Sequence, residues 1–410
     1  MLFTRKLLRA AGIASDIFSV EIDPALAAEI ASADTYSGSP DNVLLIHHGI
    51  GNGSENWLKS LPDRKVMVFH NITPSRFFAA DHPIQPLLTQ GWQQLDTWRD
   101  WLDGAIADSD TNLDILTEYG YDSTRCRTIP LLVDLDSICT FPPAPSPRPI
   151  DDIFHLLFVG RLVPHKNQRE LVQVLAHVRQ MTGLNVHLTL IGGGENSYRE
   201  FIEKGAHDLG LASVVHLTGK VTDAELADYF RKSDLYVSLS QHEGFGVPLI
   251  EAMAHCLPVV AFDTPGSNVA KTLGGAGIIL DDDNPIAVAS VIASTIEQPL
   301  LRRELVKKGL LEVQRFTVGK LYDQLSLFFN SIGIEIPEKN FEDCSNKVSD
   351  YRIEGPFDSS YSLAIVNSNL ALSLAKSGAS VALHATEGPG DYLPNHDFLA
   401  KNPSLQGLYS

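Results

Sequence analysis

Short apolar runs alternate with longer amphipathic segments through the middle of the chain. The runs are rich in Val, Leu, Ile and Phe, as is typical of buried strands. They predict strands at Leu156–Val159, Val186–Ile191, Val214–Leu217, Leu235–Leu239 and Val259–Phe262. The spacing of apolar positions between and after them predicts helices over 167–181, 196–209, 223–232, 247–255, 285–297 and 299–314. This alternation predicts an open parallel sheet with helices on both faces, which binds ligands at the carboxyl ends of its strands.

The N-terminal part repeats this pattern less clearly. Strands are predicted at Val43–Ile46, Lys65–Phe69 and Arg127–Ile129, and a helix over 84–103. That helix carries Trp92, Trp98 and Trp101, which we interpret as packing residues rather than a ligand platform. Five prolines between Pro142 and Pro149 exclude a helix and predict a stiff linker over 142–150. The sequence therefore predicts two α/β domains, over 1–141 and 151–318.

The composition excludes several functional classes. The 410 residues are 44% hydrophobic and 20% charged, as expected of a globular protein with two or three domains. A formal charge of −18 argues against a nucleic-acid partner, because phosphate backbones are bound by Lys and Arg. Four scattered cysteines favour a reduced, cytoplasmic compartment. No apolar run is long enough to span a membrane, and peripheral contact with the inner membrane face stays an open alternative.

The stretch 242–251 is the most informative motif in the chain. It places two carboxylates, Glu243 and Glu251, around a glycine pair that opens onto a helix. Gly244 and Gly246 allow the backbone to approach a ligand closely. The N–H groups at this helix start would point outward and bind phosphate; they belong to Phe245, Gly246 and Val247. The motif suits a nucleoside diphosphate sugar, although a Pro-x-x-Glu run is also an ordinary helix start.

Two cations follow the first strand of the second domain. Arg161 and Lys166 would lie where they could neutralise a diphosphate docked at the helix start near Gly246. The charge on a nucleoside diphosphate grows as a glycosidic bond breaks, so fixed cations stabilise the transition state more than the ground state. The alternative is that both are surface residues without a role.

Four motifs together carry a family resemblance. They are Gly-Arg-x-x-x-x-Lys at 160–166, Gly-Gly-Gly-Glu at 192–195, Thr-Gly-Lys-Val at 218–221 and Glu-Gly-Phe-Gly-x-Pro-x-x-Glu at 243–251. As a set they resemble the retaining GT-B glycosyltransferases, the group 1 glycosyl transferases with the Glu-x7-Glu motif. The resemblance is strong over 155–315 and looser over 40–135. It implies two Rossmann-like domains that face each other across a cleft, with a helix over 319–335 returning to the N-terminal domain.

The resemblance implies a role for each matching position on the donor side. Arg161 and Lys166 would hold the diphosphate, together with the backbone of residues 244–247. Glu243 would contact the hydroxyls of the donor sugar, and Glu251 those of the ribose. Lys220 and Val221 would border the base. No metal or cofactor is expected, because Arg and Lys replace the cation that other transferases use.

Three histidines are candidates in the N-terminal domain. The segment Val68–Thr73 resembles the strand end of the family that carries a histidine, which would place His70 beside the transferred sugar. His47 and His48 end the preceding strand and could line the acceptor side. A single histidine is also often a satisfied structural residue, so a packing role is the alternative.

The sequence departs from the family pattern in two places. Cys256 stands where the family often has glycine, which we expect to be a tolerable packing change. The first strand and glycine-rich loop of the N-terminal domain are missing, and Met1 would begin inside the helix that follows them. We therefore expect one of two alternatives. Either the chain is a fragment, or a C-terminal unit takes the place of that strand.

The C-terminal residues predict that unit. After a linker over 336–349, Tyr351–Glu354 and Val381–His384 are expected to be strands, with a helix over 363–376 between them. We interpret this β-α-β pattern as the start of a second glycosyltransferase module over 350–410, truncated at its end. Residues 354–362 resemble the opening loop of such a module.

These observations predict an enzyme that moves a hexose, with retention, from a nucleoside diphosphate sugar to a glycan or lipid-linked glycan. Residues 70–74 resemble bacterial polysaccharide mannosyltransferases, so mannose and surface polysaccharide synthesis are expected. The main alternative is a catalytically silent nucleotide-sugar-binding module or a fragment of a larger multi-module transferase. An epimerase or a phosphorylase of the same fold is a third reading.

Overall fold

The computed structural model describes residues 1–131, 133, 135, 138, 153–339, 341, 351–354, 368, 370–373, 381–384 and 405. The chain divides into two compact units. One comprises Met1–Ile138 with Phe154–Asp343, and the other Cys139–Ile153 with Cys344–Ser410. The predicted linker 142–150, most of the linker 336–349 and the loop 355–360 lie outside the described residues.

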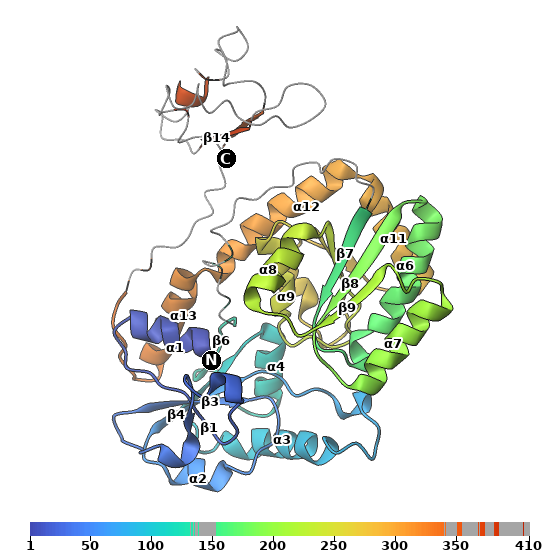
Figure 1. Ribbon diagram of the computed structural model, residues 1–410. Coiled ribbons are helices and arrows are strands. Elements are labelled where there is room, and N and C mark those ends of the chain that lie inside the picture. The colour runs from blue at the N-terminus through green and yellow to red at the C-terminus, as the bar shows by residue number, and fades with distance from the viewer. Residues whose placement is uncertain are drawn as a thin grey trace. The chain divides into compact units, whose positions relative to one another are not determined.

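A six-stranded sheet forms the centre of residues 153–312. Its strand order is β12-β11-β10-β7-β8-β9. The strands are β7 (Ile153–Val159), β8 (Asn185–Ile191), β9 (Val215–Gly219), β10 (Leu235–Ser238), β11 (Val259–Phe262) and β12 (Ile278–Leu280). The helices are α6 (Gln168–Thr182), α7 (Asn196–Asp208), α8 (Asp223–Lys232), α9 (Val247–Ala254), α10 (Val269–Leu273), α11 (Pro285–Glu297) and α12 (Pro299–Glu312). Figure 1 shows α6, α7 and α11 on one face of this sheet and α8 and α9 on the other.

The strand and helix predictions for this half are confirmed to within a few residues, except that β12 and α10 were not predicted. The pattern was readable because buried aliphatic residues dominate each strand. Leu188, Leu190 and Val237 are completely buried in one core with residues of α6 and α11. Side-chain caps fix two helix starts: Thr222 and Glu225 form a capping box on α8, and Asn284 caps α11.

The first half of the chain builds a smaller parallel sheet. Its strands are β3 (Val43–His48), β4 (Arg64–Phe69), β5 (Gly104–Ala107) and β6 (Cys126–Thr128), in the order β3-β4-β5-β6. The helices α2 (Glu55–Ser60), α3 (Gln85–Trp98) and α4 (Asp110–Glu118) belong to this half. Trp98 is completely buried, and Trp92 and Trp101 pack against the same core, which confirms their predicted packing role.

One helix prediction was too long, and the elements α2, β5 and α4 were not predicted. The helix expected over 84–103 ends at Trp98, and the chain then turns into β5. This strand reads Gly-Ala-Ile-Ala, which is too short and too poor in β-branched residues to give a strand signal. The helix α4 after it was missed for the same reason, because its position depends on recognising the strand.

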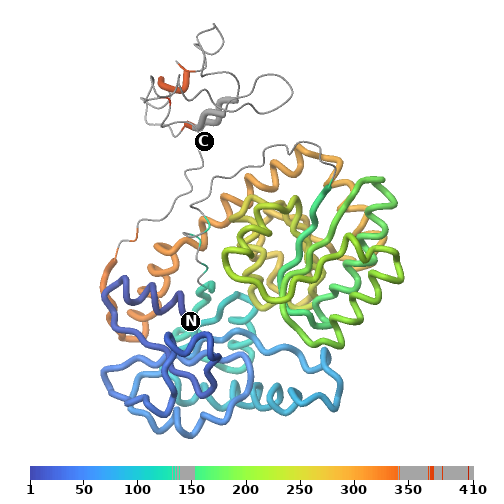
Figure 2. The backbone as a smooth tube through the Cα atoms, in the orientation of Figure 1, coloured from blue at the N-terminus to red at the C-terminus, as the bar shows by residue number. Residues whose placement is uncertain are grey.

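The other face of the first sheet is covered by both ends of this unit. Helix α1 (Leu2–Ala10) contributes Leu7, and α13 (Val318–Ser331) contributes Phe328 and other residues, to one core with Val66 and Ile106. In Figure 2 the orange segment of α13 lies beside the blue segment of α1, although they are far apart in the sequence.

The remaining elements are short. They are the parallel strand pair β1 (Phe18–Ser19) and β2 (Ala31–Ser32), and the 3-10 turns η1 (Pro24–Leu26), η2 (Ala33–Thr35), η3 (Ser75–Phe77), η4 (Pro164–Lys166) and η5 (Val313–Phe316). In the second unit β13 (Tyr351–Glu354) pairs in parallel with β14 (Val381–His384), and residues 370–373 are helical. The C-terminal β-α-β pattern is thereby confirmed.

Candidate active site

The loop after β10 leads into the start of α9, where Val247 and Pro248 are partly buried. Gly246 has φ +85°, and a Cβ there would lie 2.8 Å from Leu249 Cδ1, so this turn requires glycine. Within the described part of the chain, the N–H groups of Phe245, Gly246 and Val247 donate to no acceptor. The side chain of Phe245 is buried against Phe316, so only its backbone is available to a ligand. The start of α9 therefore has the donor groups of an anion site.

A lysine and a glutamate meet beside this helix start. Lys166 Nζ donates to Glu243 Oε1 at 2.5 Å and to the carbonyl oxygen of His242 at 3.0 Å. Both side chains are mostly buried, with exposures of 15% for Lys166 and 19% for Glu243. A lysine ammonium has three N–H donors, so one remains for a further acceptor. The structure thus brings together the two motifs at 160–166 and 243–251.

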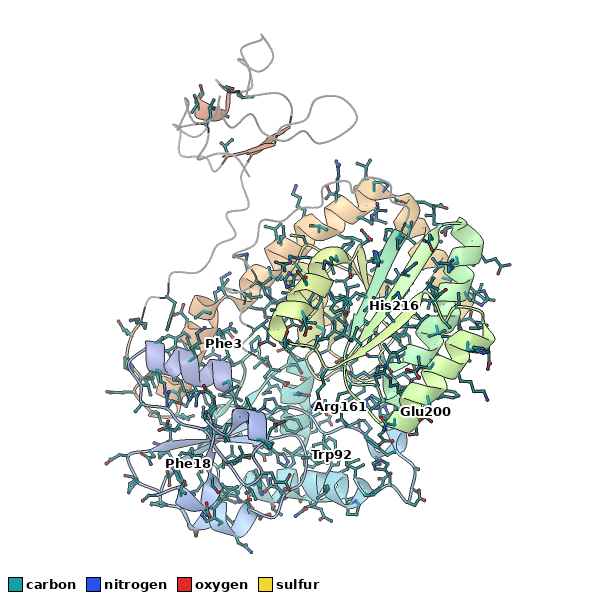
Figure 3. All side chains as sticks on the ribbon, viewed as in Figure 1. Phe3, Phe18, Trp92, Arg161, Glu200 and His216 are labelled. Atoms are coloured by element: carbon teal, nitrogen blue, oxygen red, sulfur yellow. The ribbon has the colours of Figure 1, made fainter. Side chains whose placement is uncertain are left out.

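Arg161 follows β7 and is exposed (Figure 3). Its carbonyl oxygen accepts from Gln168 Nε2 at 2.6 Å, which fixes the backbone at the start of α6. In the described residues its guanidinium has no ion-pair partner. The guanidinium is therefore available to an anionic ligand.

Three strand-end loops are held together through glycines. The N–H of Gly160 donates to Ile191, and that of Gly192 to Gly219. A Cβ at Gly192 would overlap the carbonyl oxygen of Gly160, so the loops approach at backbone distance. The stem of Lys220 covers Gly193, at 3.2 Å from the position of a Cβ, and Val221 beside it is partly buried. Lys220 and Val221 therefore stand at the β9 side of the loop that follows β8.

Glu251 lies just over one turn inside α9, where it is partly buried. Burial, and to a smaller extent the nearby charge of Asp223, raises the pKa of its carboxyl to about 7. Near neutral pH this carboxyl group is therefore partly protonated and partly ionised. A ligand hydroxyl that donates to it would favour the ionised form.

His70 directly follows β4 and is held by two neighbours. Its Nδ1 lies 3.3 Å from Asp108 Oδ2, and its Nε2 lies 2.6 Å from His47 Nδ1. An ionised Asp108 can only accept, so we assign the Nδ1 proton of His70 to this contact, and His47 then donates to His70 Nε2. Burial and the proximity of His70 lower the pKa of His47 to about 3, which keeps His47 neutral. Both ring nitrogens of His70 are thus engaged within the protein.

His48 does not line the acceptor side. It is completely buried, its Nε2 lies 3.0 Å from the carbonyl oxygen of Gly91, and its ring packs against Trp98. Successive residues of a strand point to opposite faces of the sheet, so His47 and His48 could not both reach one ligand. This corrects the expectation for His48, whose role is packing.

The loop that carries Glu243 contacts the strand end that carries His70. A Cβ at Gly244 would lie 3.1 Å from the carbonyl oxygen of His70 and 3.4 Å from Asn71 Cβ. Two further contacts join the two halves of this unit: Thr111 Oγ1 to Asn268 Oδ1 at 3.4 Å, and His82 Nε2 to Glu195 Oε1 at 3.5 Å. The structure therefore gathers His70, Glu243 and Lys166 at one junction between the two sheets.

Asp108 is a candidate that the sequence analysis missed. Its side chain is only 3% exposed, and it accepts from both His70 and Asn112. The available signal was an acidic residue directly after the apolar run Ile106-Ala107 and before Ser109, which caps α4. That signal was lost because β5 itself was not recognised.

Two further features, a metal site and a membrane-spanning helix, are both absent from the described residues. No group of three or more His, Cys, Asp or Glu side chains there has a geometry that could hold a metal ion. Among the same residues, no helix is both long enough and apolar enough to cross a lipid bilayer.

The second half of this unit has a recognisable family signature. Residues 146–311 match the family model described as glycosyl transferases group 1. The matched segment contains Arg161, Lys166 and the whole stretch 242–251, so the donor-side candidates lie inside it.

Curated relatives support the same assignment of this segment. The D-inositol 3-phosphate glycosyltransferase of Pseudarthrobacter chlorophenolicus is 30% identical over 208 residues, 49% of this chain and 49% of the relative. The protein of the same name from Thermomonospora curvata is 33% identical over 174 residues, 41% of this chain and 40% of the relative. The chain thus spans about half the length, or less, of these relatives.

Solved structures show the fold. The sucrose-phosphate synthase of Thermosynechococcus elongatus has a TM-score of 0.64 at 20% identity and covers 80% of this chain and 92% of its own. The HepE protein of Anabaena, solved with UDP and glucose, has a TM-score of 0.54 at 21% identity. The match covers 66% of this chain and 72% of the HepE chain. The two parallel sheets and these likenesses confirm the predicted GT-B fold.

Proposed function

We propose that this protein is a retaining glycosyltransferase that moves a hexose from a nucleoside diphosphate sugar to a hydroxyl of a glycan. One observation carries the proposal. The loop with Glu243 touches the backbone of His70, which places the Lys166–Glu243 pair and the free N–H groups of α9 at one junction. Group 1 segments of this kind act on nucleotide sugars, which is the activity that the matched region supports.

The donor would bind along the strand ends of the second sheet. The diphosphate would accept from the N–H groups of residues 245–247 and from the remaining donor of Lys166, with Arg161 as a second cation. Glu243 would accept from a sugar hydroxyl, and Glu251 from the ribose. Each charge-assisted hydrogen bond of this kind contributes about 1.5–3 kcal/mol.

In the transfer step the bond between the anomeric carbon and the phosphate oxygen breaks, and its electron pair stays on the diphosphate. Lys166, Arg161 and the start of α9 stabilise that growing charge, so this mechanism needs no metal ion. The acceptor hydroxyl forms the new bond on the face that the diphosphate leaves. Its proton passes to the departing phosphate oxygen, which balances the reaction.

The sugar and the cellular role form the finer part of the proposal. Residues 70–74 favour mannose as the transferred sugar and a glycan or lipid-linked glycan of a bacterial surface polysaccharide as the acceptor. A structure of HepE was solved with UDP-glucose, and the two curated relatives described above are named for inositol 3-phosphate, so glucose donors and that acceptor belong in any assay. We place the protein in the cytoplasm, with the inner membrane face as a peripheral contact.

The test combines calorimetry with a transfer assay. We expect UDP or GDP to bind, and one of UDP-glucose, UDP-N-acetylglucosamine and GDP-mannose to be consumed in the presence of a glycan. Lys166→Ala should lower the transfer rate by about 100-fold, as removal of a transition-state contact does elsewhere. Lys204→Ala, at an exposed position of α7, is the matched control and should change nothing. Absence of nucleotide binding would refute the proposal.

A catalytically silent nucleotide-sugar-binding module is the second candidate. The observation in its favour is that Asp108 and His47 occupy both ring nitrogens of His70, so that side chain offers no free nitrogen to a sugar. Nucleotide binding without transfer or donor hydrolysis, for every donor and acceptor tried, would favour this reading.

A further inference from the structure

A pocket of about 420 Å³ lies beside the candidate donor loop. Its lining includes Arg76 and Phe77 from the loop after β4, and Gln241, Phe262 and Asp283 from the ends of β10, β11 and β12. None of these residues belongs to the donor-binding set described above. The pocket is therefore distinct from the candidate donor site.

The strand order fixes where the pocket lies relative to the donor. Lys220 and Val221, the candidate base neighbours, follow β9 at one edge of the sheet. At the other edge Phe262 ends β11 and Asp283 follows β12. The loop with Glu243 follows β10, between those edges. A donor with its base at the β9 side and its sugar near Glu243 would leave the β11–β12 side free for a second substrate.

Contacts tie the pocket wall directly to the donor loop. Gln241 precedes Glu243 by two residues, and its carbonyl oxygen accepts from Thr264 Oγ1 at 3.0 Å. The ring of Phe77 lies 6.1 Å from that of His242, whose carbonyl oxygen is bound by Lys166. The pocket is thus separated from the Lys166–Glu243 pair by only one layer of residues.

The lining suits a sugar ring. Phe77 and Phe262 supply aromatic carbon, and the guanidinium of Arg76 lies 4.8 Å from the centre of the Phe77 ring. Among the described residues, neither Arg76 nor Asp283 has an ion-pair partner, so both are available to a ligand. A hydroxyl group can accept from a guanidinium and donate to a carboxylate, so a sugar can use both charged groups. A phosphate would bind Arg76 but would be repelled by Asp283.

We propose that this pocket is the acceptor subsite and that it binds a neutral sugar ring rather than a phosphorylated acceptor. The assignment of the pocket as an acceptor site rests on the proposed transferase function. The expected binding of a neutral sugar rests only on the residues that line the pocket. Phe77 and Phe262 would contact the carbon face of the ring, and Arg76, Gln241 and Asp283 would bind its hydroxyls.

Saturation-transfer NMR on the full chain tests the proposal without any donor. The probes are methyl α-mannoside, methyl α-glucoside, lactose and chitobiose, with inositol 3-phosphate as the phosphorylated competitor. We expect at least one neutral sugar to bind, with affinity about five- to tenfold weaker in Phe77→Ala and in Asp283→Asn, the usual cost of losing a central contact. Phe201→Ala and Asp281→Asn, exposed residues of the same types outside the pocket, are the matched controls.

The outcomes separate this proposal from the transferase function. Binding of a neutral sugar that both pocket variants weaken, and neither control does, supports the subsite. Preference for inositol phosphate, absence of sugar binding, or equal binding by all variants would overturn it. UDP binding is measured on the same samples. Absence of UDP binding by the wild type would contradict the donor site alone. UDP binding by the variants shows that they are folded.

Discussion

At the scale of single residues, Glu251 shows a conflict between stability and binding. Its carboxyl has a pKa of about 7 in the folded chain against 4.5 as the ordinary value. Between these two pH values the folded state holds a proton that the unfolded state has released, so the contribution of Glu251 to stability falls as pH rises from about 4.5 to about 7. Above pH 7 the full penalty of the buried charge, at most about 3 kcal/mol, is present.

Glu251→Gln should therefore stabilise the protein at pH 8 and leave its stability nearly unchanged at pH 4.5. Denaturant unfolding at the two pH values measures the difference, and UDP titration should show weaker binding. Glu200→Gln, at an exposed position of α7, is the matched control. A gain of equal size at both pH values would contradict the assignment of this pKa.

Asp108 orients His70 because a carboxylate is the only side chain that can accept from both its neighbours. Asn112 donates to one oxygen and His70 to the other. Asp108→Asn offers a single acceptor and leaves one buried donor unsatisfied. We expect transfer to fall by about tenfold, because the lost buried hydrogen bond that orients the ring of His70 costs about 1–3 kcal/mol, while UDP affinity stays unchanged.

Asp110→Asn controls for this change, since Asp110 is exposed two residues further on. Steady-state kinetics and calorimetry on the same preparations give both readouts. A parallel loss of UDP binding and transfer would show that Asp108 acts through folding rather than through His70.

At the scale of elements, glycines set the spacing of the strand-end loops. Gly192 has φ +143°, and a side chain there would overlap the carbonyl oxygen of Gly160. Gly192→Ala should cost about 3 kcal/mol or more, because backbone strain and overlap add. It should also weaken UDP binding, because the loop from 160 carries Arg161.

Gly210→Ala separates the two causes. Gly210 has φ +69° and no atom within 4 Å of a Cβ, so only the backbone strain of about 1 kcal/mol applies. Thermal unfolding of both variants measures the costs. Equal costs would show that the loops can move apart, contrary to the tight approach at Gly160.

At the scale of the whole described unit, the last helix completes the core of the first sheet. Phe328 in α13 is 1% exposed, and its ring touches the position that a Cβ of Gly104 would occupy, at 3.1 Å. The guanidinium of Arg64 at the start of β4 also donates to the carbonyl oxygen of Ile332, at 2.8 Å. Residues more than two hundred positions apart in the sequence thus stabilise one sheet.

Phe328→Ala should cost about 3–5 kcal/mol, as buried aromatic truncations do, and hydrogen exchange should increase in β4 and β5. Leu327→Ala is the matched control, because Leu327 is the neighbouring residue and is 57% exposed, and its cost should stay within about 0.5 kcal/mol. Exchange that increases only in α13 would mean that the helix is not part of this core.

The sequence alone determined the donor motifs and all strands of the second sheet except β12, because buried aliphatic strands, glycine turns and helix starts are local signals carried by neighbouring residues. Arg161, Lys166 and the stretch 242–251 were predicted on that basis, and the structure brings Lys166 and Glu243 into contact. Only the tertiary structure decided the rest. Asp108, the burial of His48 and the pocket at Phe262 depend on which strands neighbour each other and which face a side chain takes. Those properties come from contacts between distant segments, which no local pattern records.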